Sequence, residues 1–88
     1  MKSKLIIDEN GSRFWRTENE IYHRIGGPSK EWYNGDKAWD VNGKKHRLDG
    51  PAFEYADGEK YWFLNDKEYT EIFFVWRAKT NTRQGLQK

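Results

Sequence analysis

The strongest constraint on this chain of 88 residues is a short pattern that occurs three times: a turn dipeptide whose glycine precedes a tryptophan by four residues. The three glycines lie 24 and then 23 residues apart, and the pairs are Gly11 and Trp15, Gly35 and Trp39, and Gly58 and Trp62. Similarity at a fixed spacing of this length indicates consecutive units that stack on one another. We therefore predict units at about residues 5–28, 29–51 and 52–70.

The turn dipeptides predict that each unit is built of β-hairpins. Asn-Gly and Asp-Gly between alternating segments favour two-residue turns in which both central residues take positive φ. The fold class expected from this pattern is mainly β. Counting outward from these turns predicts the cross-strand partner of each tryptophan: Ile6 for Trp15, Lys30 for Trp39, and Phe53 for Trp62.

A second set of turns, at residues 42–43 and 65–66, predicts the cross-strand partners on the other side of each tryptophan. The first unit has one more residue in this region, so it needs a bulge or a longer loop to keep the same pairing. The three pairs predicted in this way are Trp15 with His23, Trp39 with His46, and Trp62 with Tyr69.

The two histidines, His23 and His46, occupy the same place in consecutive units, and the third unit has Tyr69 there. Because a tyrosine ring cannot perform imidazole chemistry, this pattern favours a packing role for the histidines. A pH-sensitive or ligand-contacting histidine and a catalytic histidine are the alternatives. Two histidines without carboxylates at a metal-binding spacing are too few for a zinc site, so we predict no metal site.

The composition bounds the class of protein. Aromatic residues make up 17% of the chain, so rings supply most of the burial and argue against disorder despite 34% charged residues. There is no cysteine, which excludes disulfides and fits a reducing compartment. No apolar run approaches the roughly 18 residues of a membrane span, and the first segment soon turns polar. We therefore expect no membrane span and a cytoplasmic location.

The end of the chain changes character after Thr70. Apolar residues at positions 72, 73, 75 and 76 and an N-cap at Thr70 predict a helix over residues 71–80 that caps the open end of the sheet. A continuing strand through residues 72–76 is the alternative, because Ile, Phe, Val and Trp also favour strands. Residues 81–88 are expected to be a basic mobile tail.

The chain resembles MORN-type repeats, in particular the HR-x-DGPA variety found in small proteins of bacteria and bacteriophages. The resemblance covers about residues 5–70 and rests on the tryptophan spacing and on HRLDGPA at residues 46–52. Unit one has HRIGGPS instead, and unit three lacks the segment. The resemblance implies a single-layer, twisted antiparallel sheet of three tandem hairpin repeats, and a non-enzymatic role in binding proteins and sometimes lipids.

The sequence contains no phosphate-binding loop, nucleophile elbow or His-Glu-x-x-His motif, so we predict neither an enzyme nor a cofactor. The rings outnumber those that one sheet layer can bury, and Trp and Tyr commonly anchor interfaces. We predict a protein-binding module, such as a phage-encoded inhibitor or adaptor acting on a host or defence protein in the host cytoplasm. Its expected contact face comprises Trp32, Tyr33, Tyr55, Tyr61 and Phe63, with Arg47, Arg77 and Lys79 as charged groups.

Three other modes of binding stay open. Single-stranded nucleic acid could stack on exposed rings, provided that basic groups share a face with those rings. The basic groups are the C-terminal Arg77, Lys79, Arg83 and Lys88, together with Arg13, Lys37 and Lys60. A small nucleotide could bind between aromatic side chains. Open sheet edges also allow a homodimer.

Overall fold

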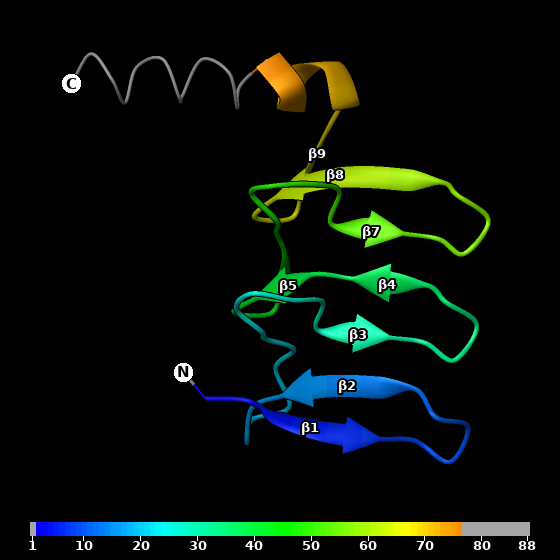
Figure 1. Cartoon of the computed structure of the whole chain (residues 1–88). Helices are drawn as coiled ribbons and strands as arrows, with labels where there is room; N and C mark the ends of the chain where they lie inside the picture. Colours follow the sequence, from blue (N-terminus) through cyan, green and yellow to red (C-terminus); the bar gives the residue numbers. More distant parts are fainter. Residues whose placement is uncertain (1, 77–88) are drawn as a thin grey trace.

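The computed structural model describes residues 2–76, and within them the chain is mainly β, with one short helix at its C-terminal end (Figure 1). Seven strands form an antiparallel sheet in the order β1-β2-β3-β4-β7-β8-β9, and β5 and β6 form a separate hairpin. The strands are β1 (Lys4–Ile7), β2 (Arg13–Arg16), β3 (Lys30–Glu31), β4 (Lys37–Ala38), β5 (Asp40–Val41), β6 (Lys44–Lys45), β7 (Phe53–Glu54), β8 (Lys60–Leu64) and β9 (Lys67–Tyr69).

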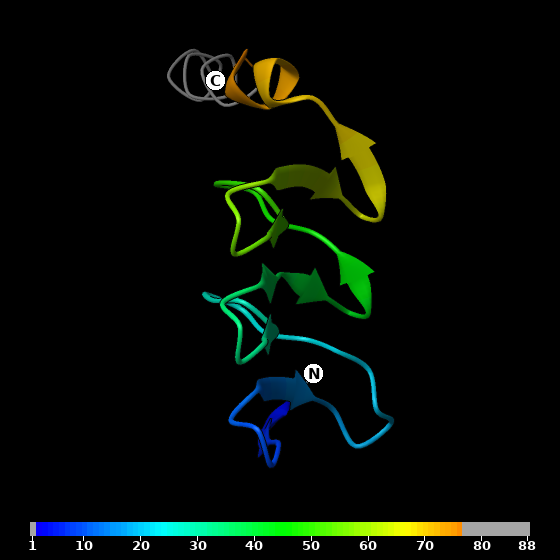
Figure 2. The ribbon, with the colours of Figure 1, turned by 90° about the vertical axis from the view of Figure 1, so that its right-hand side faces the viewer.

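The hairpins are stacked along one direction, so their order in the sequence is also their order in space (Figure 1). The side view shows that β9 and the β5–β6 hairpin leave the column on the same side (Figure 2). Among residues 2–76, no helix that could cross a membrane is found.

The turns that precede the tryptophans differ from the predicted two-residue type. Gly35 takes a φ of 101°, whereas Asn34 before it has no positive φ. The loop closes when Trp32 N donates to Asp36 O at 2.9 Å, so it contains three residues rather than two. The predicted partners of the three tryptophans are therefore wrong by one position. The observed pairs are Leu5 with Trp15, Lys30 with Ala38, and Phe53 with Tyr61.

A side-chain hydrogen bond explains this turn type. Asn34 Oδ1 accepts the backbone N–H of Asp36 at 3.1 Å, and the same bond joins Asn10 to Ser12 at 3.0 Å. Such a bond to the backbone two residues on favours a turn in which only the following glycine takes positive φ. Because a shift of one residue moves every side chain to the other face of a strand, the correction decides which residues share a face.

The second set of turns is of the predicted two-residue type. Asn42 and Gly43 take φ of 54° and 81°, and the turn at residues 65–66 likewise has two positive φ angles. His46 N donates to Trp39 O at 3.0 Å, which confirms that pair, and Trp62 lies opposite Tyr69.

The first unit has the longer loop that its additional residue requires. Thr17 N donates to Ile21 O at 2.9 Å, and Glu20 takes a φ of 62°. With the loop closed in this way, His23 N donates to Trp15 O at 3.1 Å. The predicted pairing of His23 with Trp15 is therefore confirmed.

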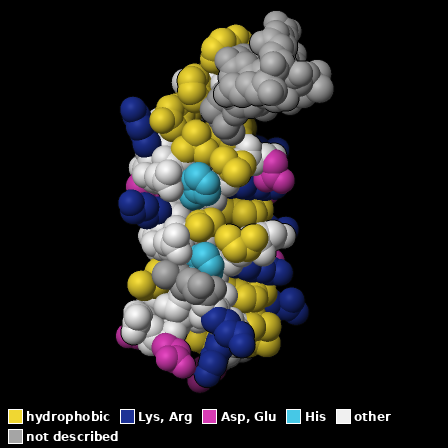
Figure 3. Space-filling model, turned by 90° about the vertical axis from the view of Figure 1, so that its left-hand side faces the viewer, with side chains coloured by type: hydrophobic (Ala, Val, Ile, Leu, Met, Phe, Trp, Pro, Cys, Tyr) yellow, Lys and Arg dark blue, Asp and Glu magenta, His cyan; other side chains and the backbone are white. Residues whose placement is uncertain are grey.

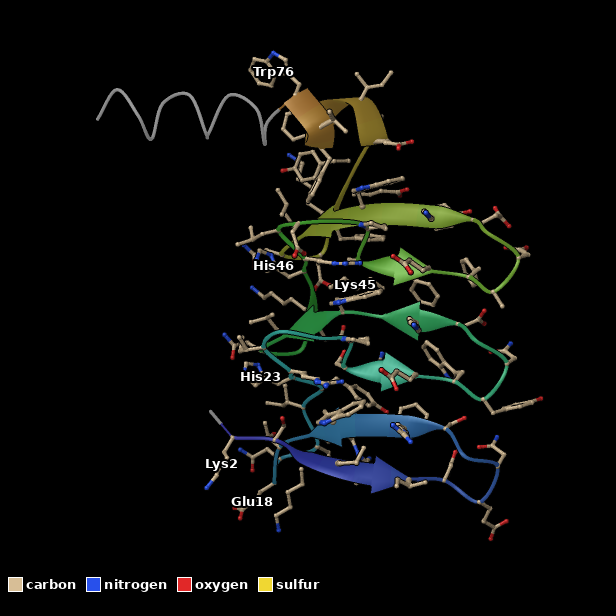
Figure 4. All side chains as sticks on the ribbon, viewed as in Figure 1. Lys2, Glu18, His23, Lys45, His46 and Trp76 are labelled. Atoms are coloured by element: carbon tan, nitrogen blue, oxygen red, sulfur yellow. The ribbon has the colours of Figure 1, made fainter. Side chains whose placement is uncertain are left out.

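The histidines connect one hairpin to the next. His23 Nδ1 accepts the N–H of Asn42 at 2.9 Å, and His46 Nδ1 accepts the N–H of Asn65 at 3.1 Å. The two imidazoles lie one above the other on the end of the molecule shown in Figure 3, and Figure 4 shows each beside the following turn. Each ring thus satisfies a backbone donor, which agrees with the predicted packing role.

Two polar side chains make a similar connection at the opposite end of the strands. Ser12 Oγ accepts the N–H of Tyr33 at 2.9 Å, and Asp36 Oδ1 accepts the N–H of Ala56 at 2.7 Å. The buried apolar residues of the described part are few and mostly small: Ala38, Ala52 and Phe74. Hydrogen bonds between hairpins therefore carry much of the specificity of this fold.

The C-terminal helix begins after Thr70 and is described over residues 71–76. Thr70 Oγ1 accepts the N–H of Phe73 at 3.1 Å, so Thr70 is the N-cap as predicted, and the alternative of a continuing strand is wrong. The predicted apolar stripe packs only in part: Phe73 stacks on Tyr69 with ring centroids 4.6 Å apart, whereas Ile72 is 82% exposed. The buried residue of the helix is Phe74, which lies outside the predicted stripe. Residues 77–80 of the predicted helix and the tail at 81–88 lie outside the described residues.

Candidate functional site

Six aromatic side chains form a continuous series of ring contacts, which we name the ring chain. Neighbouring centroids are 6.3, 6.1, 5.7, 4.5 and 5.8 Å apart along the series. These distances lie in the range in which aromatic pairs attract one another beyond simple area burial. The members of the ring chain, in order of contact, are Tyr22, Phe14, Trp32, Phe53, Tyr55 and Tyr61.

The observed strand register explains why these rings meet. Side chains directly opposite on antiparallel strands share a face, and so do residues two apart on one strand. Phe53 lies opposite Tyr61 on β8, and Tyr55 follows Phe53 by two residues. Phe14 lies opposite Lys30, and Trp32 follows Lys30 by two residues. One face of the sheet therefore collects all of these rings.

The ring chain is partly open to solvent. Tyr55 is 40% exposed and Tyr61 is 36% exposed, whereas Trp32 and Phe53 are half-buried. Phe63 joins this end of the chain, where a shallow hollow of about 220 Å³ is lined by Lys45, Phe53, Tyr55, Tyr61 and Phe63. The face thus offers aromatic edges and surfaces to a binding partner rather than a closed pocket.

Two lysines accompany the rings. Lys30 Nζ lies 4.2 Å from the Tyr22 ring centroid, and Lys45 Nζ lies 5.6 Å from that of Phe63. Lys30 also pairs with the buried carboxylate of Asp40 at 3.7 Å. Because Asp40 accepts a further hydrogen bond from Ser29 Oγ at 2.5 Å, its charge is compensated within the fold. Asp40 lies opposite Lys45 on the β5–β6 hairpin, and Asp40 is buried.

The Tyr61 hydroxyl is held by a carboxylate at the rim of the ring chain. Its Oη donates to Glu59 Oε2 at 2.9 Å. This hydrogen bond and the negative charge of Glu59 raise the pKa of Tyr61 above its ordinary value, because both favour the protonated phenol. The hydroxyl therefore remains an oriented, neutral polar group at neutral pH.

The opposite face of the sheet carries a row of alternating charge, which we name the charge ladder. Successive cross-strand partners on this face have opposite signs, so each of the three inner charges lies between two of the other sign. Such a row is largely self-neutralised. Its members, in strand order, are Arg13, Glu31, Lys37, Glu54 and Lys60.

Two arginines on the charge-ladder side are integral to the fold. Arg47 Cζ lies 4.0 Å from the Trp39 ring centroid, and its Nη1 donates to Pro51 O at 3.0 Å and to Glu54 Oε2 at 3.1 Å. Arg24 repeats the arrangement, 3.8 Å from the Trp15 ring and bonded to the Pro28 carbonyl. In each His-Arg segment, the arginine therefore connects a tryptophan to the Gly-Pro loop that follows the arginine.

The glycine of each Gly-Pro pair leaves space for the guanidinium group of the arginine three residues before it. A Cβ on Gly50 would lie 2.8 Å from Arg47 Cζ, and a Cβ on Gly27 would lie 2.8 Å from Arg24 Cζ. Neither glycine has positive φ, so the requirement is for space and not for a special backbone conformation. Asp49 adds a hydrogen bond from Arg47 Nε at 3.0 Å.

The structure brings together some of the residues predicted for the contact face. Trp32, Tyr55 and Tyr61 belong to the ring chain, and Phe63 borders it. Tyr33 is 71% exposed but lies in a turn outside the ring chain. Of the three predicted charged groups, Arg47 is engaged on the opposite side of the sheet, and Arg77 and Lys79 lie outside the described residues.

The sequence-based prediction missed three residues of the ring chain, Phe14, Tyr22 and Phe53, and the two lysines beside it, Lys30 and Lys45. The two-residue turn had paired Phe53 with Trp62, which placed Phe53 on the wrong face. One hydrogen bond in each turn distinguishes the two registers. The side-chain oxygen of the residue before the glycine accepts the backbone N–H of the residue after it.

No cluster of three or more His, Cys, Asp or Glu side chains suited to a metal ion is found in the part of the chain from residue 2 to 76. No protein-family model, curated protein or solved structure matches this chain.

Proposed function

We propose that the chain is a non-enzymatic protein-binding module that contacts its partner through the ring chain. The observation that carries this proposal is the unbroken series of six rings along one face, with Tyr55 and Tyr61 more than a third exposed. Tyrosine and tryptophan supply most of the binding energy at many protein interfaces, because they bury a large area with little loss of conformational freedom. The polar rim that such a face needs is provided by Lys45 and Glu59.

We also propose that the sheet is a MORN-like array of three tandem repeats. In support, contacts recur at a spacing of 23 residues: His23 and His46 each accept the N–H of the next turn, and Arg24 and Arg47 each stack on a tryptophan. An array of this kind presents one extended surface to a partner. From the resemblance to small phage and bacterial proteins, we place that partner among host or defence proteins, with the chain acting as an inhibitor or adaptor in the cytoplasm.

Binding of single-stranded nucleic acid is less well supported by the geometry. Stacking on rings requires phosphate-neutralising groups on the same face. Arg13, Lys37 and Lys60 lie on the opposite face, where Glu31 and Glu54 separate them. Of the two lysines that lie beside the ring chain within residues 2–76, Lys30 is already paired with Asp40, which leaves Lys45.

The test compares two tyrosine variants of the full chain, Tyr55→Ala and Tyr33→Ala. Tyr55 stacks on Phe53 with centroids 4.5 Å apart inside the ring chain, whereas Tyr33 lies outside it and is 71% exposed. Immobilised wild-type and variant proteins are used to capture partners from a cell extract, and the captured protein is then titrated by calorimetry. We expect Tyr55→Ala to weaken binding by about 30-fold, the usual effect of losing an aromatic hot spot. The control Tyr33→Ala should bind like the wild type.

Three results would contradict this proposal. One is equal binding by wild type and Tyr55→Ala when circular dichroism shows both to be folded. The second is failure to capture any protein. The third is a salt-sensitive shift with a single-stranded oligonucleotide that Tyr55→Ala abolishes, which would assign the same face to nucleic acid.

A further inference from the structure

β1 is an edge strand with an apolar, open side. It is the first strand in the sheet order and the lowest strand in Figure 1, and among residues 2–76 only β2 pairs with it. Leu5, Ile6 and Ile7 are 46%, 37% and 61% exposed. An edge with unpaired backbone groups and exposed apolar side chains is a template for pairing with another strand.

The hydrogen-bond pattern shows which backbone groups face outward. In an antiparallel pair, residues alternate between those that bond to the partner and those whose groups point away. Asp8 N donates to Ser12 O at 2.8 Å, so Asp8 and alternate residues before it bond toward β2. Trp15, opposite Leu5, donates instead to Ser29 O at 2.9 Å. The N–H and C=O groups of Leu5 and Ile7 therefore point to the open edge.

The segment Lys4 to Asp8 is complementary to itself when two copies run antiparallel. If Ile6 lies opposite Ile6 of a second copy, Leu5 lies opposite Ile7 and Lys4 lies opposite Asp8. The outward N–H and C=O groups of Leu5 in one copy then form hydrogen bonds with those of Ile7 in the other copy. The apolar side chains meet at the centre of the pairing. Lys4 and Asp8 are both exposed, so an opposite charge is available at each end of the pairing.

We propose that β1 pairs with β1 of a second copy of this chain, antiparallel and centred on Ile6, to form a two-fold symmetric dimer. No other register that uses the same outward groups places Lys4 opposite Asp8. The surface is small, so the dimer is reversible and depends on concentration.

This pairing has a consequence for the ring chain. The two-fold axis is perpendicular to the sheet, because each residue pairs with one that faces the same way. Phe14, opposite Ile6 on β2, therefore lies on the same side in both copies. The dimer presents two ring chains on one continuous face, and a partner with two matching sites would bind with increased avidity.

The test uses charge exchange at the two ends of the strand. Lys4→Glu places a carboxylate opposite Asp8 of the other copy, and Asp8→Lys places an ammonium group opposite its Lys4. Either variant alone should weaken dimerisation by about tenfold, since each creates two symmetry-related like-charge contacts. A 1:1 mixture should form a heterodimer, because both contacts are then between opposite charges. Lys44→Glu makes the same charge change on the β5–β6 hairpin and should leave dimerisation unchanged.

Sedimentation equilibrium of each protein and native mass spectrometry of the mixture give the readout. Recovery of a dimer in the mixture also shows that both variants are folded, so loss of dimer in the single variants cannot be due to unfolding. The proposal is overturned if the wild type is monomeric at all soluble concentrations. It is equally overturned if the wild-type dimer is unaffected by either charge change, or if the mixture shows no preference for the heterodimer.

Discussion

Replacing Gly50 with alanine is expected to destabilise the protein through Arg47, and the structure gives the size of the effect. The new Cβ would lie 2.8 Å from Arg47 Cζ and 3.1 Å from both Nε and Nη1, so the guanidinium must move. It would lose its stacking on Trp39, worth about 0.5–1 kcal/mol, and its bond to Pro51 O, worth about 0.5–1.5 kcal/mol. With weakening of the exposed pair to Asp49, we expect a loss of about 2 kcal/mol.

A double-mutant cycle separates this cause from a backbone effect. In an Arg47→Ala background the Cβ of residue 50 has no guanidinium to meet. Because Gly50 does not have positive φ, Gly50→Ala should then be neutral or should stabilise by about 0.4–1 kcal/mol through the unfolded state. The coupling energy between the two positions should therefore be about 2–3 kcal/mol.

Urea unfolding followed by tryptophan fluorescence measures all four proteins of the cycle. The reasoning is refuted if Gly50→Ala lowers the free energy of unfolding equally in both backgrounds. It is also refuted if the substitution has no effect on the wild type, since Arg47 would then have an alternative position of equal energy.

Two further predictions concern the turns and the ring chain. Asp36→Ala should lower the free energy of unfolding by about 0.5–1.5 kcal/mol, because it removes the hydrogen bond from the N–H of Ala56, whereas Glu59→Ala at the corresponding place in the last hairpin should change it by less than about 0.5 kcal/mol. Equal effects in urea titrations would contradict this difference. Glu59→Gln should bring the pKa of Tyr61 down toward its ordinary value, as measured by NMR titration of the labelled ring, and an unchanged pKa would show that Glu59 is not its cause. Since the folded-state pKa of Tyr61 is raised, its stabilising contribution is present at neutral pH and is lost as pH rises through that pKa.

The sequence was sufficient to predict the mainly β architecture and the turns whose conformation follows from two residues alone. Asn42 and Gly43 both take positive φ, and the pairing beyond them was predicted correctly. The turn at residues 34–35 has the same dipeptide but a different length, because the Asn34 side chain bonds to Asp36. A dipeptide does not reveal that choice, and the resulting one-residue error placed Phe53 on the wrong face.

The role of the His-Arg segments was only half predictable. Replacement of histidine by Tyr69 in the third unit indicated a packing role, and the hydrogen bond from Asn65 to His46 agrees with it. The stacking of Arg47 on Trp39 depends on a loop path that no local pattern specifies. Likewise, the periodicity of the C-terminal segment predicted a helix but not that Phe74 would be its buried residue.

The central claim is that the ring chain, and not the charge ladder, is the binding face. The most direct measurement is the change in amide and aromatic NMR shifts of the labelled chain when the captured partner is added. We predict that the largest changes occur at Trp32, Tyr55 and Tyr61, with small changes at Arg13 and Lys37. Changes concentrated along the charge ladder would contradict the claim.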